Sequence, residues 1–176
     1  MAHFQRAKIR RVFDAMDGDG DGLLTKADFE RLTERWVAIR PAADEERLRR
    51  VMMGWWETLR AAADTDADGR LTLDEVFAVA RELPAAPGAV YETAEAMFDA
   101  VDEDGDGRIS RLEYQKMIWA WTERSEHADA VFALLDGDGD GFLTRPRFTG
   151  LWYDFWATDD PAGAGAVLFG PVEPVP

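Results

Sequence analysis

The chain has 176 residues, of which 47% are hydrophobic, enough to bury one sizeable core or two small ones. Its 35 acidic and 20 basic residues give a formal net charge of −15, which repels nucleic-acid phosphates and anionic membranes and favours cations as partners. There is no cysteine, which excludes disulfides and thiolate zinc sites, and no apolar leader or membrane-length apolar run, so we expect a soluble cytoplasmic protein.

An acidic pattern, Asp-x-Asp-x-Asp-Gly, organises the chain. Its four copies begin at Asp17, Asp64, Asp102 and Asp136. Apolar residues at helical spacing flank every copy, so the sequence predicts four loops, each between an entering and an exiting helix. One acidic run of this kind would also suit a solvated turn. Four copies with the same glycine and the same flanking pattern make a solvated turn an inadequate explanation.

The loops have the composition that a hard cation needs. Calcium takes about six to eight oxygen ligands, and a loop of about twelve residues can supply them from positions 1, 3, 5, 7, 9 and 12, with glycine at position 6 for a sharp turn. Position 7 contributes its backbone carbonyl and position 12 a bidentate carboxylate. This arrangement is the EF-hand calcium loop. The pattern therefore predicts an all-α chain of four helix–loop–helix units.

The first unit has a full donor set with a shortened closing residue. Its predicted donors are the carboxylates of Asp17, Asp19, Asp21 and Asp28 and the carbonyl of Leu23. Asp28 is one methylene shorter than glutamate, so bidentate closure requires a tighter loop. Magnesium prefers octahedral six-coordination, and we expect it to compete with calcium most strongly here. After this unit, Pro41 ends the exiting helix, and Asp44 is predicted to cap the next helix.

The second unit has a complete loop followed by a break. Its predicted donors are the carboxylates of Asp64, Asp66, Asp68 and Glu75 and the carbonyl of Arg70. Beyond its exiting helix, Pro84 and Pro87 remove backbone donors and disfavour helix in the residues before them. The sequence therefore predicts a bend over residues 84–90, which allows the two halves of the chain to fold face to face.

The third loop is complete and the fourth has lost its closing ligand. The predicted donors of the third are the carboxylates of Asp102, Asp104, Asp106 and Glu113 and the carbonyl of Arg108. The fourth keeps Asp136, Asp138 and Asp140 but ends in Arg147, which cannot ligate a cation. We expect the fourth unit to keep its fold and lose tight metal binding. Weak binding by its three aspartates, with water at the closing position, is the alternative.

Position 8 of every loop is apolar, which predicts how the units pair. These residues are Leu24, Leu71, Ile109 and Leu143. Two such positions can join through a short antiparallel strand pair, the first loop with the second and the third with the fourth. The predicted organisation is an N-terminal pair over residues 1–83, the bend, a C-terminal pair over residues 91–157, and a tail over residues 158–176.

The remaining residues argue for a core and against catalysis. The seven tryptophans and ten phenylalanines fall mostly at core spacing, so packing is the favoured interpretation, with a recognition surface as the alternative. His3 and His127 stand far apart, and the serines are Ser110 and Ser125. A nucleophile–base pair therefore has no plausible members, and we expect no enzyme activity.

The whole chain resembles the sarcoplasmic calcium-binding proteins and their bacterial relative calerythrin. The resemblance lies in the four units, the long interval between the first two loops, and a first loop closed by Asp28 and Phe29. It implies a compact fold in which one or two hands are silent. Residues 166–170 resemble that family's tail, which implies that Leu168 and Phe169 fill an apolar cleft between the lobes. An arginine-to-lysine ratio of 17 to 3 also favours a bacterial source.

Two functions fit these observations. The first is an intracellular buffer for calcium, and for magnesium at the first loop, with three working loops and no exposed target groove. The second is a sensor that opens on binding calcium and presents an apolar groove to a partner protein. We expect a monomer whose ligands are calcium ions, with no nucleic-acid or membrane partner.

Overall fold

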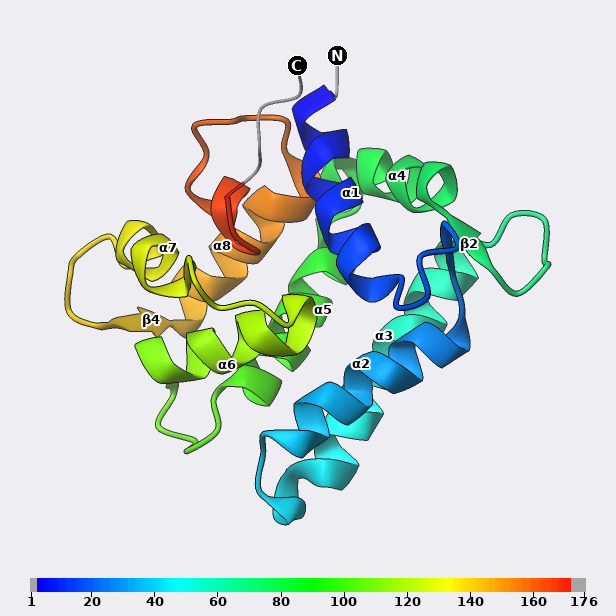
Figure 1. Cartoon of the computed structure of the whole chain (residues 1–176). Helices are drawn as coiled ribbons and strands as arrows, with labels where there is room; N and C mark the ends of the chain where they lie inside the picture. The colour runs from blue at the N-terminus through cyan, green and yellow to red at the C-terminus, as the bar shows by residue number, and fades with distance from the viewer. Residues whose placement is uncertain (1–2, 172–176) are drawn as a thin grey trace.

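The computed structural model describes residues 3–171, which form eight α-helices connected mostly by loops (Figure 1). The helices are α1 (His3–Met16), α2 (Lys26–Ala38), α3 (Glu45–Ala63), α4 (Leu73–Glu82), α5 (Pro87–Val101), α6 (Arg111–Thr122), α7 (Ala128–Leu135) and α8 (Arg145–Ala157). Three short 3₁₀ turns are η1 (Ala42–Asp44), η2 (Leu83–Ala85) and η3 (Ala164–Val167). No helix in this part of the chain is both long and apolar enough to cross a membrane.

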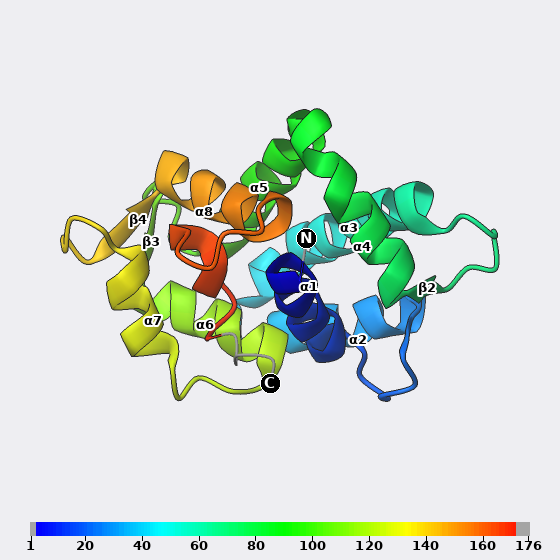
Figure 2. The ribbon, with the colours of Figure 1, turned by 90° about the horizontal axis from the view of Figure 1, so that it is seen from above.

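Two small antiparallel strand pairs join the loops, as the apolar eighth positions predict. Strands β1 (Leu23–Leu24) and β2 (Leu71–Thr72) pair with Leu24 opposite Leu71. Strands β3 (Arg108–Ser110) and β4 (Phe142–Thr144) pair with Ile109 opposite Leu143. All four of these apolar residues are fully buried. The predicted all-α fold of four paired units is confirmed, and Figure 2 shows the loops of the two pairs at opposite ends of the molecule.

The connections between helices differ from the prediction in two places. The bend is shorter than residues 84–90, because α5 begins at Pro87. Proline is well tolerated in the first turn of a helix, where its missing N–H would have had no partner. Asp44 stands directly before α3, but its side chain makes no capping hydrogen bond. It forms ion pairs instead, with Arg40 at 2.8 Å and Arg47 at 3.3 Å.

Aromatic side chains join the two pairs of units into one core. Trp55 of α3 lies against Trp121 of α6, with 5.2 Å between the ring centroids, and against Trp152 and Trp156 of α8. Trp55 also lies against Phe29 of α2, with 5.4 Å between the ring centroids. Aromatic pairs at these distances add about 0.5–1.5 kcal/mol each to the burial of apolar surface. The N-terminal and C-terminal pairs are therefore held together by shared packing.

Residues of the tail complete this core. Leu168 and Phe169 are buried, and the aromatic rings around Phe169 come from α6 and α8, the nearest being Phe155 at 4.7 Å between centroids. Tyr114 of α6 donates a hydrogen bond to the carbonyl of Leu168 at 2.7 Å, and Arg11 of α1 donates to that of Phe169 at 3.2 Å. The tail thus links α6, α8 and α1. Residues 172–176 of the predicted tail lie outside the described residues.

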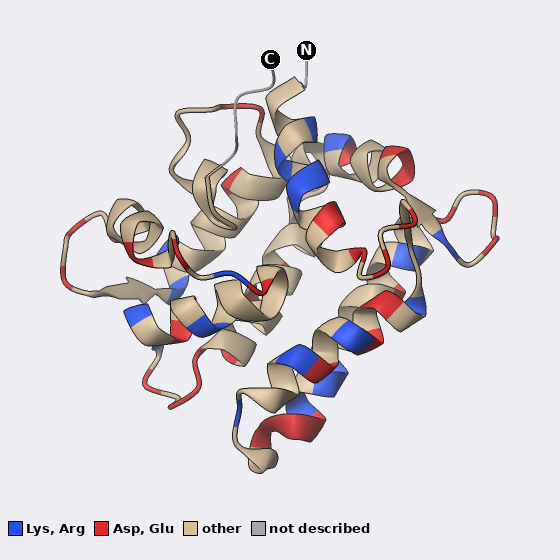
Figure 3. Ribbon diagram, viewed as in Figure 1, with Lys and Arg blue, Asp and Glu red and all other residues tan. Residues whose placement is uncertain are grey.

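Basic side chains of the N-terminal pair bond to the ends of helices in the C-terminal pair. Figure 3 shows Lys and Arg residues along α1, α2 and the first turns of α3. Lys8 donates to the carbonyls of Asp154 and Thr158 at 3.0 and 2.9 Å, where α8 ends. Arg35 donates to the carbonyl of Ala120 at 2.8 Å, in the last turn of α6. The last carbonyls of a helix have no partner within it, so each bond satisfies an otherwise unpaired group.

Lys8 should make stability depend on pH. Burial lowers the pKa of its fully buried ammonium from 10.5 to about 8, against the opposing effect of nearby aspartates. Between these two values the unfolded chain binds more protons than the folded one, so stability rises with pH. We expect the free energy of unfolding of the natural protein, relative to Lys8→Met, to increase by about 2 kcal/mol from about pH 7.5 to 9.5. Denaturant unfolding at several pH values measures this.

The control for that measurement is Lys26→Met. Lys26 lies on α2 with its side chain largely exposed and pairs with Glu30 at 3.9 Å. The stability difference between the natural protein and this variant should stay nearly constant over the same pH range. Equal pH slopes for the Lys8 and Lys26 variants would show that the buried ammonium does not titrate as described.

Candidate metal centres

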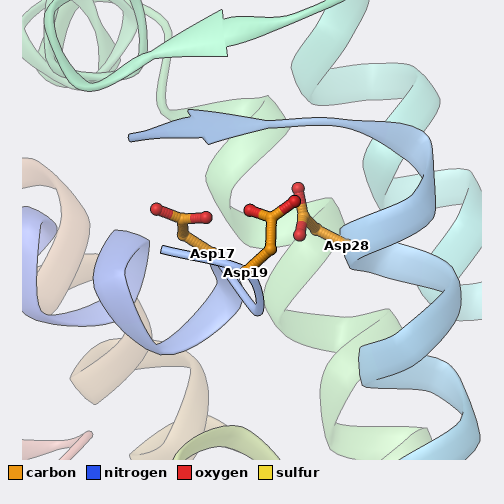
Figure 4. A group of neighbouring side chains, drawn as sticks. All are labelled: Asp17, Asp19 and Asp28. Atoms are coloured by element: carbon orange, nitrogen blue, oxygen red, sulfur yellow. The ribbon is translucent and has the colours of Figure 1, made fainter. Parts of the chain in front are cut away.

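Each of the four loops brings three acidic side chains together. Within each group, one carboxylate oxygen per residue lies within 4.8 Å of the others. The groups are Asp17, Asp19 and Asp28; Asp64, Asp66 and Glu75; Asp102, Asp104 and Glu113; and Asp136, Asp138 and Asp140. Figure 4 shows the first group, in which Asp28 approaches from α2 toward the two aspartates of the loop. The first three groups combine donors from both ends of a loop, and the fourth comes from its first half alone.

The first aspartate of each loop shapes the turn that follows it. Asp102 accepts hydrogen bonds from the backbone N–H groups of Gly105 and Gly107, both at 3.0 Å. Gly107, at position 6, has a φ of +80°, which favours glycine because it has no Cβ. The N–H bonds curl the backbone around the carboxylates, so the loop converges on one point.

Positions 5 and 7 lie at the rim of the first three loops. Asp21, Asp68 and Asp106 fall outside the closest groups, and each accepts the N–H of the residue at position 7, at 2.8–2.9 Å. The position-7 residues are Leu23, Arg70 and Arg108, whose predicted contribution is a carbonyl. The guanidinium of Arg108 pairs with Asp106 at 3.3 Å, away from the three converging carboxylates. The converging side-chain atoms at the centre of each loop are therefore carboxylate oxygens.

The closing glutamates are fixed by the helices that they begin. Glu113 accepts the backbone N–H and the hydroxyl of Ser110 on one oxygen, at 2.8 and 2.9 Å, and the N–H of Glu103 on the other, at 2.8 Å. Glu75 has the same arrangement with Thr72 at 2.9 Å. This is a capping box, in which the third helical residue bonds back to the N-cap. It turns each closing carboxylate over its loop.

In the first loop Arg31, which sequence reasoning missed, contacts the closing acid Asp28. Asp28 is 1% exposed and accepts the N–H and hydroxyl of Thr25 on Oδ2, at 2.8 and 3.0 Å. Its Oδ1 accepts the N–H of Gly18 at 3.2 Å and also a short hydrogen bond from Arg31. Arg31 lies 3.9 Å from Asp19 as well. The signal for this contact in the sequence was a basic residue three positions after the closing acid.

In the fourth loop, Arg147 bonds to the end of the preceding helix while its guanidinium stays against the loop. Its Nε donates to the carbonyl of Leu135 at 2.9 Å, at the end of α7, and its guanidinium lies beside Gly137. Among the described residues it makes no ion pair with Asp136, Asp138 or Asp140. The first half of the loop therefore keeps its converging carboxylates, and what is missing is the closing oxygen.

Two of the loop carboxyl groups hold protons more readily than usual. Burial raises the pKa of Asp17 and of Asp102, against the opposing hydrogen bonds from backbone N–H groups. The pKa of Glu75 is lowered, chiefly by the backbone N–H of Thr72. Protons therefore compete for the position-1 oxygens of the first and third loops before they compete for the closing oxygen of the second.

The donor sets fit calcium or magnesium. All the converging side-chain donors are carboxylate oxygens, which suit hard cations, whereas zinc and copper sites draw on nitrogen and sulfur. A model of the EF-hand domain pair matches residues 6–81 and 61–118, and a model of a single EF hand matches residues 128–146. The chain belongs to the EF-hand family.

Known EF-hand proteins show where in the family it lies. The sarcoplasmic calcium-binding protein alpha-B and -A chains of Penaeus sp. are 31% identical to it over 184 residues, covering 95% of this chain and 94% of theirs. Calerythrin of Saccharopolyspora erythraea is 27% identical over 129 residues, covering 64% of this chain and 70% of its own. The sarcoplasmic calcium-binding protein of amphioxus shares the fold, with a TM-score of 0.73 at 23% identity and 98% of both chains covered. The resemblance predicted from the sequence is confirmed.

Proposed function

We propose that this EF-hand protein is a cytoplasmic calcium buffer that binds one ion in each of its first three loops. The ligands are the carboxylates at positions 1, 3, 5 and 12 and the carbonyl at position 7 of those loops. The observation that carries the proposal is that three loops each gather acidic donors from both ends within 4.8 Å. Tight buffers of this family act in the cytosol, where free calcium is low.

The closed core favours a buffer over a sensor. A sensor opens a helix pair and exposes an apolar groove to its target. Here the rings that would line such a groove are already packed, with Trp121 and Trp152 around Phe169 of the tail. The large apolar side chains that are exposed in the described part of the chain are Tyr91, Leu112, Trp119 and Leu134, spread over three helices. Opening the molecule would have to break the shared core.

A sensor is the second candidate because one apolar cavity lies between the pairs. Its volume is about 100 Å³, and it is lined by α3 and α4 on one side and α5 and α8 on the other. Trp55, Trp152 and Trp156 form part of its wall. If calcium separated the two pairs, this cavity would be the start of a target groove.

A calcium titration distinguishes the two functions. Metal-free protein is titrated at constant magnesium, while calorimetry counts the bound ions and a dye reports exposed apolar surface. A buffer should bind about three ions with flat or falling dye fluorescence. A sharp rise in fluorescence as calcium binds would instead support the sensor and overturn the buffer.

Restoring the closing acid of the fourth loop should create a fourth tight site. We expect Arg147→Glu to raise the number of tightly bound calcium ions from three to four, because the three converging aspartates of that loop lack only a closing carboxylate. Thr144 already occupies the N-cap position that would hold the new glutamate. Calorimetry measures the stoichiometry. Arg147→Gln is the control, since it removes the positive charge without adding a carboxylate. A fourth tight site in that control would mean that the charge was the obstacle.

A further inference from the structure

The first loop differs from the other two complete loops by a cation on its closing carboxylate. Arg31, at position 15 counted from Asp17, donates to Oδ1 of Asp28. The third loop has Lys116 at the same position, but this lysine pairs at 2.6 Å with Glu103 at position 2. The first loop has Gly18 at position 2, so no acidic side chain is there to hold Arg31. The arginine turns to the closing acid instead.

Gly18 also provides the space that this arrangement needs. A Cβ at Gly18 would lie 2.9 Å from Nε of Arg31, so the guanidinium lies over the backbone where other residues would have a side chain. Gly18 is not among the residues with positive φ, and its backbone conformation accepts other residues. The glycine and the arginine therefore act as one unit, and a side chain at position 18 would push the flexible guanidinium away.

We propose that Arg31 is the residue that sets the ion preference of the first loop, favouring magnesium over calcium. This rests on the proposed function, in which the loop binds a divalent ion. The guanidinium occupies Oδ1 of Asp28, and Oδ2 accepts two hydrogen bonds from Thr25, so the carboxylate offers an ion at most one oxygen while Arg31 stays in place. Calcium loses its bidentate ligand, while magnesium, with about six ligands and near-octahedral geometry, needs fewer protein oxygens.

The positive charge of Arg31 also lowers the affinity of the first loop for a divalent ion. Its side chain is 49% exposed, so solvent screens it, but it lies between Asp28 and Asp19 at the edge of the ion's position. A unit positive charge beside a divalent ion in such a solvent-facing position weakens binding by about tenfold. The ion must also displace the guanidinium to gain the second oxygen of Asp28, and this adds to the penalty for calcium in particular.

The test isolates the first loop in the full-length protein. Glu75→Gln with Glu113→Gln removes tight binding at the second and third loops. In that background Arg31→Met and, separately, Gly18→Glu are titrated with calcium and with magnesium by calorimetry. The glutamate supplies the position-2 acid that Glu103 provides in the third loop, so it should draw Arg31 away from Asp28. Both variants should bind calcium about tenfold more tightly and raise the ratio of calcium to magnesium affinity.

The matched control is Lys116→Met, measured with Asp28→Asn and Glu75→Gln so that the third loop is the one observed. It removes the same charge from the same loop position, but from a side chain that pairs with Glu103. Its calcium affinity should change less than threefold. An equal gain in this control would overturn the proposal, because the effect would then be general electrostatics and independent of the contact with the closing acid.

The remaining outcomes separate this proposal from the proposed function. If the background binds an ion at the first loop and neither Arg31→Met nor Gly18→Glu changes its preference, the role of Arg31 is wrong and the loop still works. If the background binds no ion and the variants do, the role of Arg31 stands and the first loop is not a working site in the natural protein. If none of them binds, both are overturned. Far-ultraviolet circular dichroism confirms that each variant is folded.

Discussion

Replacing Glu113 by glutamine is expected to lower the calcium affinity of the third loop by about two orders of magnitude. Glu113 is buried and lies with Asp102 and Asp104 in the converging acidic group of this loop. Glutamine offers one oxygen and no charge, so the bidentate ligand is lost while the shape of the side chain is kept. Calorimetry at micromolar protein should count one tight ion fewer than in the natural protein.

The control is Glu103→Gln in the same loop, made together with Lys116→Met and compared with Lys116→Met alone, so that no cation is freed to pair with Glu113. Glu103 is also a glutamate and lies at position 2 of the loop, where its carboxylate pairs with Lys116 at 2.6 Å and with Arg40 at 3.6 Å, outside the converging group. Its replacement should change calcium affinity by less than about threefold. Equal losses in the two variants would mean that charge near the loop matters and that the position of the closing oxygens does not.

Replacing Phe169 by alanine is expected to destabilise the calcium-loaded protein by about 3–5 kcal/mol. The ring is 1% exposed and lies 4.7 Å from Phe155 and 5.2 Å from Trp121, measured between centroids. Its removal leaves a cavity among large rings that cannot collapse to fill it. Denaturant unfolding at saturating calcium measures the loss. Dye binding should also rise, because the apolar surface that the tail covers becomes accessible.

Leu134→Ala provides the comparison for that experiment. Leu134 lies on α7 with 67% of its surface exposed. An exposed leucine contributes little, so the stability should change by about 0.5 kcal/mol or less. If Phe169→Ala cost no more than Leu134→Ala, the tail would not be part of the core, and the argument for a closed buffer would lose its main support.

The local structure of this protein follows from its sequence because short-range rules decide it. Helical spacing places Ile9, Val12 and Met16 on one buried face, as the structure has them. The apolar eighth positions predict the pairing of Leu24 with Leu71. An apolar side chain in an otherwise polar loop is buried when it meets the same position of a second loop. Donors at fixed positions in a loop converge because the backbone between them is short.

Apart from the shorter bend, the failed and missing predictions concern side chains that have more than one partner within reach. Asp44 stands where a helix cap belongs, yet Arg40 and Arg47 occupy its carboxylate. Arg147 donates to the carbonyl of Leu135 at the end of α7 while its guanidinium stays beside Gly137 of the loop. Arg31 reaches Asp28 because position 18 is glycine, a dependence between two residues that no periodicity reveals.

The sequence by itself determined the four loops, the acidic residues that converge in them, the strand pairs and the family, because these depend on residues that are close in the chain. The tertiary structure decided how the two pairs join. Trp55 brings the aromatic rings of both pairs into one core, and Lys8 and Arg35 bond to the last carbonyls of α8 and α6. A long basic side chain can satisfy any nearby helix end. Only the packing of the helices determines which end lies within reach.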